Sequence, residues 1–325
     1  MTRHTRSSHT RRWPCLALLL AGLAALLTFV AAWRILPPRP TAADLAYASL
    51  SPRQRLDIYL PRGTGPHPVV IWVHGGAWRW GERALPPLAA PFAVLDRGYA
   101  LVSVGYRLTD EATFPAQIQD LRAAVRWLRA NAVAYDLDPE RFAVWGFSAG
   151  GHLAALLGTA GTVAALDDPR LGDPAISSRV QAVVAWASPS DLAALAGQPS
   201  PPGCPAGERV DEGGTRSPVA WLLGGPPELV PEQARLANPL TYISADDPPF
   251  LIQHGREDCV VPYQQSELLY GALVPVIGAE HVTLTLFDAG HDPSLLSLSP
   301  FSRWANRERV LDFLDQQLGR VRRAG

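Results

Sequence analysis

Short apolar runs alternate with helical patterns along the chain from about residue 45. The continuous apolar run 68–76 is typical of a strand covered on both faces, whereas 55–61 alternates with period two and predicts an edge strand. Further runs of the strand type span 99–108, 141–148, 180–188, 248–255 and 281–291.

Helical patterns lie between these runs. In the segment 114–132, apolar residues recur at spacings of three and four, which predicts a helix with one buried stripe, and Pro115 suits its first turn. The stripe consists of Ile118, Leu121, Val125 and Leu128. Other helical patterns cover 150–160, 263–274 and 305–321. The alternation predicts an α/β fold: a mostly parallel sheet of about eight strands with helices on both faces, in which ligands bind beyond the carboxyl ends of the strands.

The segment 189–247 departs from this rhythm, because it is long, irregular and rich in proline and glycine. So long a connection in a compact domain is usually a lid or a binding loop. We therefore expect a small lid-like insertion with one short helix near 217–223, within a single catalytic domain that spans 41–325.

The first 40 residues form a separate unit. Four arginines precede an uncharged stretch from Trp13 to Trp33, and 21 apolar or small residues are enough to span a bilayer as a helix. The arginines place the N-terminus in the cytoplasm and the body outside it. We expect residues 1–40 to be a basic tail with a membrane anchor. The alternative is a secretory signal cleaved after the small residues Val30-Ala31-Ala32, which would release the body.

Composition narrows the chemistry. The net charge is −1 and no basic stretch lies beyond the N-terminus, so nothing indicates nucleic-acid binding. All 29 basic residues are arginine, which excludes a Schiff-base or phosphate-loop lysine. Three cysteines make neither a disulfide framework nor a metal cluster, and no metal or cofactor is implied. A single Cys204–Cys259 bridge is one option in an oxidising compartment.

The strongest motif is Gly146-Phe-Ser148-Ala-Gly150, between a predicted strand and a predicted helix. A serine on such a sharp turn is forced into a strained conformation with its hydroxyl exposed above the sheet, and the flanking glycines avoid clashes. The amide of Ala149 would then stabilise an oxyanion formed on the target of Ser148.

A serine nucleophile needs a base and an acid that orients it. Among eight histidines, His291 is late in the chain and on a loop after the last strand. The expected order of serine, acid and histidine favours Asp258, although Glu257, Asp288 and Asp292 are rivals.

A second set of backbone donors is expected in the loop 74–81 after the first buried strand, because a Gly-Gly pair lets the backbone approach an oxyanion closely. The candidate donors are Gly75, Gly76 and Ala77. Trp78 and Trp80 either line the pocket or pack beneath it.

With these motifs in order, the chain resembles an α/β-hydrolase carboxylesterase of the hormone-sensitive-lipase-like, feruloyl-esterase-like and kynurenine-formamidase-like group. The resemblance covers about residues 50–318 and implies the α/β-hydrolase fold. It also implies Ser148 as nucleophile, His291 as base and Asp258 as its partner. The implied oxyanion hole consists of Gly76, Ala77 and Ala149, with Gly75 supporting the loop.

We therefore expect a serine hydrolase that cleaves small-molecule carboxylic esters through an acyl-enzyme intermediate. One alternative is an amide-cleaving relative with the same machinery, such as an arylformamidase or an aminopeptidase. The other is a catalytically inactive hydrolase fold that acts as a binding module. The oligomeric state is not predicted.

Overall fold

A computed structural model describes residues 37–86, 89–205, 207–211, 213–292 and 304–319. Its eight strands are β1 (Ala42–Ala46), β2 (Arg55–Tyr59), β3 (His67–Val73), β4 (Ala100–Val104), β5 (Leu137–Phe147), β6 (Ala182–Trp186), β7 (Phe250–Gly255) and β8 (Val282–Phe287). They form one sheet in the order β1-β2-β4-β3-β5-β6-β7-β8. The pairs β1–β2 and β2–β4 are antiparallel, and all the others are parallel.

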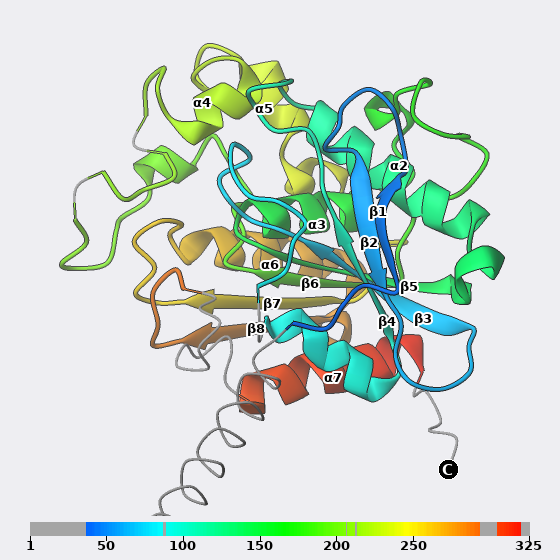
Figure 1. The fold of residues 1–325 in the computed structure, drawn as a ribbon. Coiled ribbons are helices and arrows are strands. Elements are labelled where there is room, and N and C mark those ends of the chain that lie inside the picture. The colour runs from blue at the N-terminus through cyan, green and yellow to red at the C-terminus, as the bar shows by residue number, and fades with distance from the viewer. Residues whose placement is uncertain (1–36, 87–88, 206, 212, 293–303, 320–325) are drawn as a thin grey trace, which may run out of the picture.

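Helices cover both faces of this sheet (Figure 1). They are α2 (Ala116–Ala130), α3 (Ala149–Thr159), α4 (Pro218–Leu223), α5 (Pro231–Leu236), α6 (Gln264–Ile277) and α7 (Trp304–Leu318), together with the 3₁₀ helix η1 (Ala90–Arg97). One apolar core joins the sheet to α2, α3 and α6, and a second core joins its other face to η1 and α7. The predicted mostly parallel sheet of about eight strands with helices on both faces is confirmed.

The helix pattern predicted for 114–132 is also confirmed. Its four stripe residues are all buried in the larger core, and Pro115 is the residue that precedes the first turn of α2.

The prediction that 55–61 is an edge strand is wrong. β2 lies between β1 and β4, and its Leu56 and Ile58 are fully buried. The edge strand on this side of the sheet is β1, which is short and largely exposed. Its sequence, AADLA, lacks the alternation that marks a half-buried strand, so the pattern gave no signal for it.

The irregular segment between β6 and β7 contains the expected short helix as α4, and also α5 and the 3₁₀ helix η5 (Pro239–Tyr242). In Figure 1, α4 and α5 lie together at the opposite side of the molecule from α7.

The apolar segment from Trp13 to Trp33 lies outside the described residues. Within the ranges that the structure describes, no helix is both long and apolar enough to cross a bilayer.

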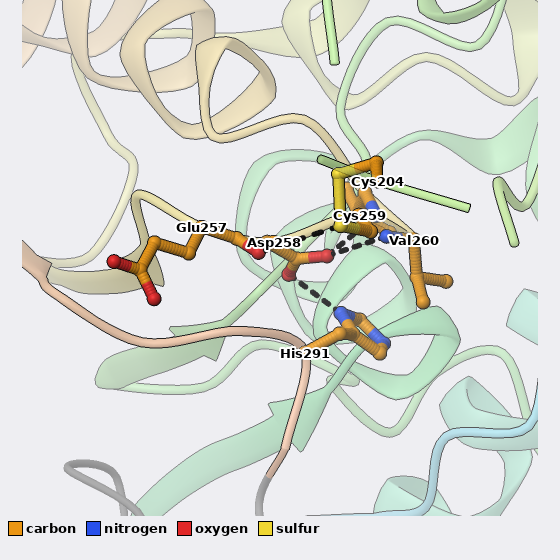
Figure 2. Close-up of a disulfide and its surroundings, with 7 residues drawn as sticks. Cys204, Glu257, Asp258, Cys259, Val260 and His291 are labelled. Carbon is orange, nitrogen blue, oxygen red and sulfur yellow. Dashed lines mark hydrogen bonds and ion pairs between the residues drawn. A yellow bond between two sulfur atoms is a disulfide. The ribbon is translucent and has the colours of Figure 1, made fainter. Parts of the chain in front are cut away.

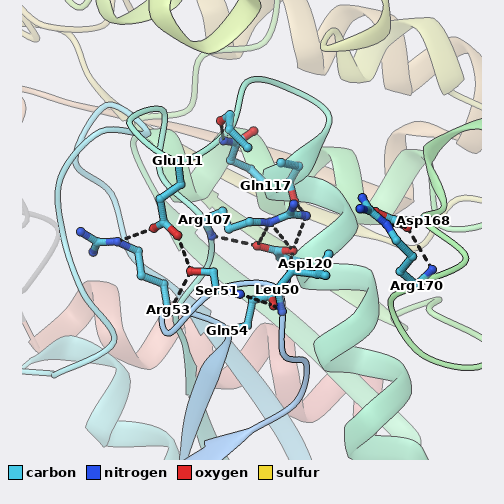
Figure 3. A network of polar contacts seen from close by, with 12 residues as sticks. Leu50, Ser51, Arg53, Gln54, Arg107, Glu111, Gln117, Asp120, Asp168 and Arg170 are labelled. Carbon is cyan, nitrogen blue, oxygen red and sulfur yellow. Dashed lines mark hydrogen bonds and ion pairs between the residues drawn. The ribbon is translucent and has the colours of Figure 1, made fainter.

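A buried ion pair fastens α2 to the loop after β4 (Figure 3). Asp120 has no exposed surface, and its carboxylate accepts hydrogen bonds from Arg107 Nη2 at 2.7 Å and from Gln54 Nε2 at 2.7 Å. The backbone N–H of Arg107 adds a further hydrogen bond at 2.8 Å. Because the adjacent Tyr106 donates its hydroxyl proton to the His74 carbonyl oxygen at 2.9 Å, this network also supports the loop that follows β3.

We expect Asp120→Asn to lower the free energy of unfolding by about 3 kcal/mol, because it leaves the buried Arg107 guanidinium without a compensating charge. Urea unfolding followed by tryptophan fluorescence measures this loss. The exposed neighbour Asp110 is the matched control, and Asp110→Asn should change the stability by less than about 0.5 kcal/mol. Equal losses in the two variants would contradict a special role for the buried pair.

Candidate active site

Four loops meet at the carboxyl ends of the parallel strands. Because β3, β5, β7 and β8 all run parallel, the segments that follow them emerge on the same side. These segments carry the glycine loop after β3, Ser148 after β5, Asp258 after β7 and His291 after β8.

The turn between β5 and α3 presents Ser148 in a conformation rare for a residue with a side chain. Its φ is 56° and its ψ is −123°. A Cβ on Gly146 would lie 2.1 Å from the Gly150 carbonyl oxygen, and one on Gly150 would lie 2.1 Å from the Val73 carbonyl oxygen. Both positions therefore need glycine, for the steric reason that the sequence motif suggested.

Ser148, His291 and Asp258 form a continuous hydrogen-bonded chain. His291 Nε2 lies 3.0 Å from the Ser148 hydroxyl oxygen, and His291 Nδ1 lies 2.6 Å from Asp258 Oδ2. A neutral His291 therefore carries its proton on Nδ1, which donates to the carboxylate, and accepts the serine proton at Nε2. The rival acid Glu257 points away from His291 (Figure 2).

The carboxylate of Asp258 is fully buried and surrounded by donors. Its Oδ1 accepts the backbone N–H groups of Val260 and Val261 at 2.9 and 2.8 Å. Its Oδ2 accepts from His291 and lies 3.2 Å from Nε2 of buried His254. Burial by itself would raise the pKa of Asp258, but the hydrogen bonds from His254 and His291 outweigh burial and lower the pKa well below its ordinary value.

His254 is a residue of this site that sequence reasoning missed. Its Nε2 also lies 2.9 Å from the Val261 carbonyl oxygen, and two acceptors at that nitrogen require a proton there. Its Nδ1 lies 2.6 Å from the Ser266 hydroxyl oxygen on α6. From the sequence, His254 was only a residue at the end of a buried strand. Nothing in the sequence indicated that the loop carrying Asp258 and Val261 folds back onto the ring of His254.

The glycine loop after β3 lies against the serine turn. A Cβ on Gly75 would lie 3.1 Å from the Ser148 Cβ, and Gly76 and Ala77 both have positive φ angles, of 110° and 51°. In the described part of the chain, the N–H groups of Gly76 and Ala77 have no hydrogen-bond acceptor. Ala149 is the first residue of α3, so its N–H has no partner within the helix either.

The two tryptophans of this loop differ. Trp78 is fully buried and donates its indole N–H to Nδ1 of His152 on α3, at 3.2 Å. Nε2 of His152 lies 2.7 Å from the Ala237 carbonyl oxygen, so His152 joins the glycine loop, the helix after Ser148 and the segment after α5. Trp80 is more than half exposed. The sequence left open whether these tryptophans line the pocket or pack beneath it. Trp78 packs beneath the site, whereas Trp80 lies at the surface.

A disulfide joins Cys204 to Cys259, the residue directly after Asp258 (Figure 2). The bridge closes a separation of 55 residues and fastens the insertion between β6 and β7 to the acid loop. The bridge that the sequence left as one option is thus present, and it keeps the insertion beside the site.

Comparisons with known proteins show which family the chain matches. The family model described as BD-FAE matches residues 56–273. The probable carboxylic ester hydrolase LipM of Mycobacterium tuberculosis is 34% identical over 252 residues, which cover 73% of this chain and 54% of LipM. Esterase LipC of the same organism is 31% identical, and the match covers 75% of this chain and 58% of LipC. The chain thus spans little more than half the length of these relatives.

Solved structures agree with the family match. A truncated carbohydrate esterase from gut microbiota superposes with a TM-score of 0.73 at 31% identity, covering 86% of this chain and 97% of that one. A bifunctional GH43-CE protein of Bacteroides eggerthii gives a TM-score of 0.71 at 34% identity, covering 85% of this chain and 35% of that one. The α/β-hydrolase fold predicted from the sequence is confirmed.

The buried histidines near the site predict a pH-dependent stability. Burial disfavours the charged ring and lowers the pKa of His74 and of His152 to about 4. An unfolded histidine titrates near about 6.5, so between these values the unfolded chain binds protons that the folded protein does not. The free energy of unfolding should therefore fall as the pH drops from about 6.5 to about 4.

In His152→Gln this fall should be smaller by about 2 kcal/mol, because one of the two rings whose pKa burial lowers is gone. Urea unfolding at a series of pH values measures how steeply the free energy of unfolding changes with pH. This slope does not depend on any loss of stability that the substitution causes equally at every pH. His281→Gln, at an exposed position, is the control and should keep the wild-type slope. An unchanged slope in His152→Gln would show that this ring is not held neutral.

Proposed function

The chain belongs to the BD-FAE family, and from this premise we propose that it is a serine hydrolase that cleaves carboxylic esters. The observation that carries the proposal is the hydrogen-bonded chain of Ser148, His291 and Asp258, at 3.0 and 2.6 Å. The names of the relatives, which include a carboxylic ester hydrolase and several esterases, support the same reaction.

In the proposed mechanism, Ser148 Oγ attacks the ester carbonyl carbon while Nε2 of His291 takes the hydroxyl proton. Asp258 stabilises the imidazolium that results, and its low pKa keeps the carboxylate ionised for this role. His291 then returns the proton to the leaving alcohol as the carbon–oxygen bond breaks. A water molecule, activated by the same histidine, releases the acyl group from Ser148.

The negative charge on the carbonyl oxygen needs donors that are free before the reaction starts. The N–H groups of Gly76, Ala77 and Ala149 meet this requirement, because none of them has an acceptor within the described residues. Gly75 supports the loop by its close approach to Ser148. Each such donor is typically worth about 3 kcal/mol in the transition state.

We expect wild-type protein to hydrolyse 4-nitrophenyl acetate and to be labelled by a fluorophosphonate probe. Ser148→Ala should abolish labelling and lower kcat by about 10⁴-fold or more. Ser177→Ala, at an exposed serine, is the control and should behave as wild type. Labelling that persists in Ser148→Ala would identify another nucleophile, and wild-type protein that is never labelled would favour an inactive binding module. Faster cleavage of an aminoacyl-nitroanilide than of the ester would favour the amide-cleaving alternative.

We also propose that the catalytic domain lies outside the cytoplasm, tethered by the apolar segment from Trp13 to Trp33. The support is the sequence alone: an uncharged stretch long enough for a bilayer, with four arginines before it. Native protein should therefore remain with the membranes after a high-salt wash and keep its original N-terminus. N-terminal sequencing that starts near Trp33 would instead show a cleaved signal.

A further inference from the structure

An open pocket of about 530 Å³ lies between the end of the glycine loop and the insertion. The glycine loop contributes Arg79 to its wall, and α4 with the segment after it contributes Trp221, Leu229 and Val230. Arg79 is the one charged residue among the described residues that line the pocket. The walls are otherwise apolar or small, so the pocket has a single strong polar feature.

Arg79 lies close to the proposed catalytic machinery. Its backbone N–H donates to the Gly76 carbonyl oxygen at 3.0 Å, and that of Trp80 donates to the same oxygen at 2.8 Å. The tight turn that presents the N–H groups of Gly76 and Ala77 thus also sets the position of Arg79. Arg79 therefore belongs to the same loop as the proposed oxyanion donors and follows Ala77 by two residues.

The guanidinium of Arg79 is held in place but not neutralised. Its central carbon lies 4.5 Å from the ring centre of Trp221 and 6.0 Å from that of Trp80, and the two rings pack edge to face. Yet no acidic residue in the described ranges forms an ion pair with Arg79, whereas the buried Arg107 is paired with Asp120.

A half-buried arginine without an acidic partner is a ready site for an anion, because its planar fork matches a carboxylate in a bidentate manner. One cation matches one negative charge, and the described residues that line the pocket include no second cation of the kind that phosphate sites gather. The hydroxyl of Thr109 lines the same pocket and has no hydrogen-bond partner within the part of the chain that the structure describes. Trp221, the one aromatic residue among the described residues that line the pocket, adds apolar surface beside a ring-shaped group that carries the carboxylate.

We propose that this pocket binds a carboxylate on the substrate through Arg79, so that the protein prefers esters with a free carboxylate to their neutral counterparts. The inference deepens the esterase function proposed above and rests on it. The insertion forms the wall of the pocket opposite Arg79. Both α4 and the disulfide that restrains the insertion would therefore contribute to substrate selection.

The test compares two matched pairs of esters. 4-Acetoxybenzoate and methyl 4-acetoxybenzoate differ by a carboxylate on the alcohol part, and the mono-4-nitrophenyl ester of glutarate and its methyl ester differ by one on the acyl part. In at least one pair, wild-type protein should favour the carboxylate by about tenfold in kcat/KM, in line with a charged hydrogen bond. Arg79→Gln should reduce that ratio to about one, and Arg79→Lys should keep part of it because the charge remains.

Arg62→Gln is the matched control, since Arg62 is exposed and precedes β3, at the end opposite to the glycine loop; it should keep the wild-type ratio. A ratio near one for both pairs in wild-type protein would overturn the proposal. So would a ratio that survives Arg79→Gln. Either result would show that Arg79 serves only to cover Trp221.

The two proposals can fail separately. Fluorophosphonate labelling of Ser148 reports the catalytic machinery and needs no carboxylate. If no ester is cleaved and no label is found, the esterase function is wrong. Calorimetric titration of 4-acetoxybenzoate into Ser148→Ala, with and without Arg79→Gln, then tests the carboxylate pocket without any need for catalysis. Binding that depends on Arg79 supports the carboxylate pocket, and no binding overturns it.

Discussion

The backbone conformation of Ser148, with φ at 56°, is the constraint from which the rest of the site follows. Such a conformation costs roughly 1–3 kcal/mol for a residue with a side chain, and the surrounding structure must supply that energy. The Ser148 N–H donates to the Trp186 carbonyl oxygen at 2.8 Å, and α3, almost wholly buried, anchors the other side of the turn. Only glycine fits at Gly146 and Gly150, so the turn cannot relax without moving β3 or α3.

A strained serine is useful only if its base is held equally firmly, and Asp258 provides that. Four donors surround its carboxylate, so the group is both ionised and oriented, and His291 has one orientation that meets Asp258 and Ser148 together. The second histidine, His254, ties the same carboxylate to β7 and α6. The disulfide at the next residue adds a covalent restraint between the acid loop and the insertion.

The parallel strands, the two-faced sheet and the serine turn were predictable because each depends on local pattern: apolar runs, helical spacing and glycines that a tight turn requires. β1 was missed because AADLA carries no such pattern and is set by pairing with β2. His254 was missed for a related reason. It acts through the returning chain at Val261, seven residues later, and a sequence does not state such a contact.

The same distinction explains why specificity is the last property to emerge. Arg79 follows the glycine motif directly, and in the sequence it is one arginine among many charged residues. It becomes distinctive only when Trp221, more than a hundred residues later, packs beneath the guanidinium and no carboxylate of the described chain reaches it. Catalytic chemistry rests on turns that local sequence dictates, whereas the proposed selection of substrate rests on an insertion that folds back over the site.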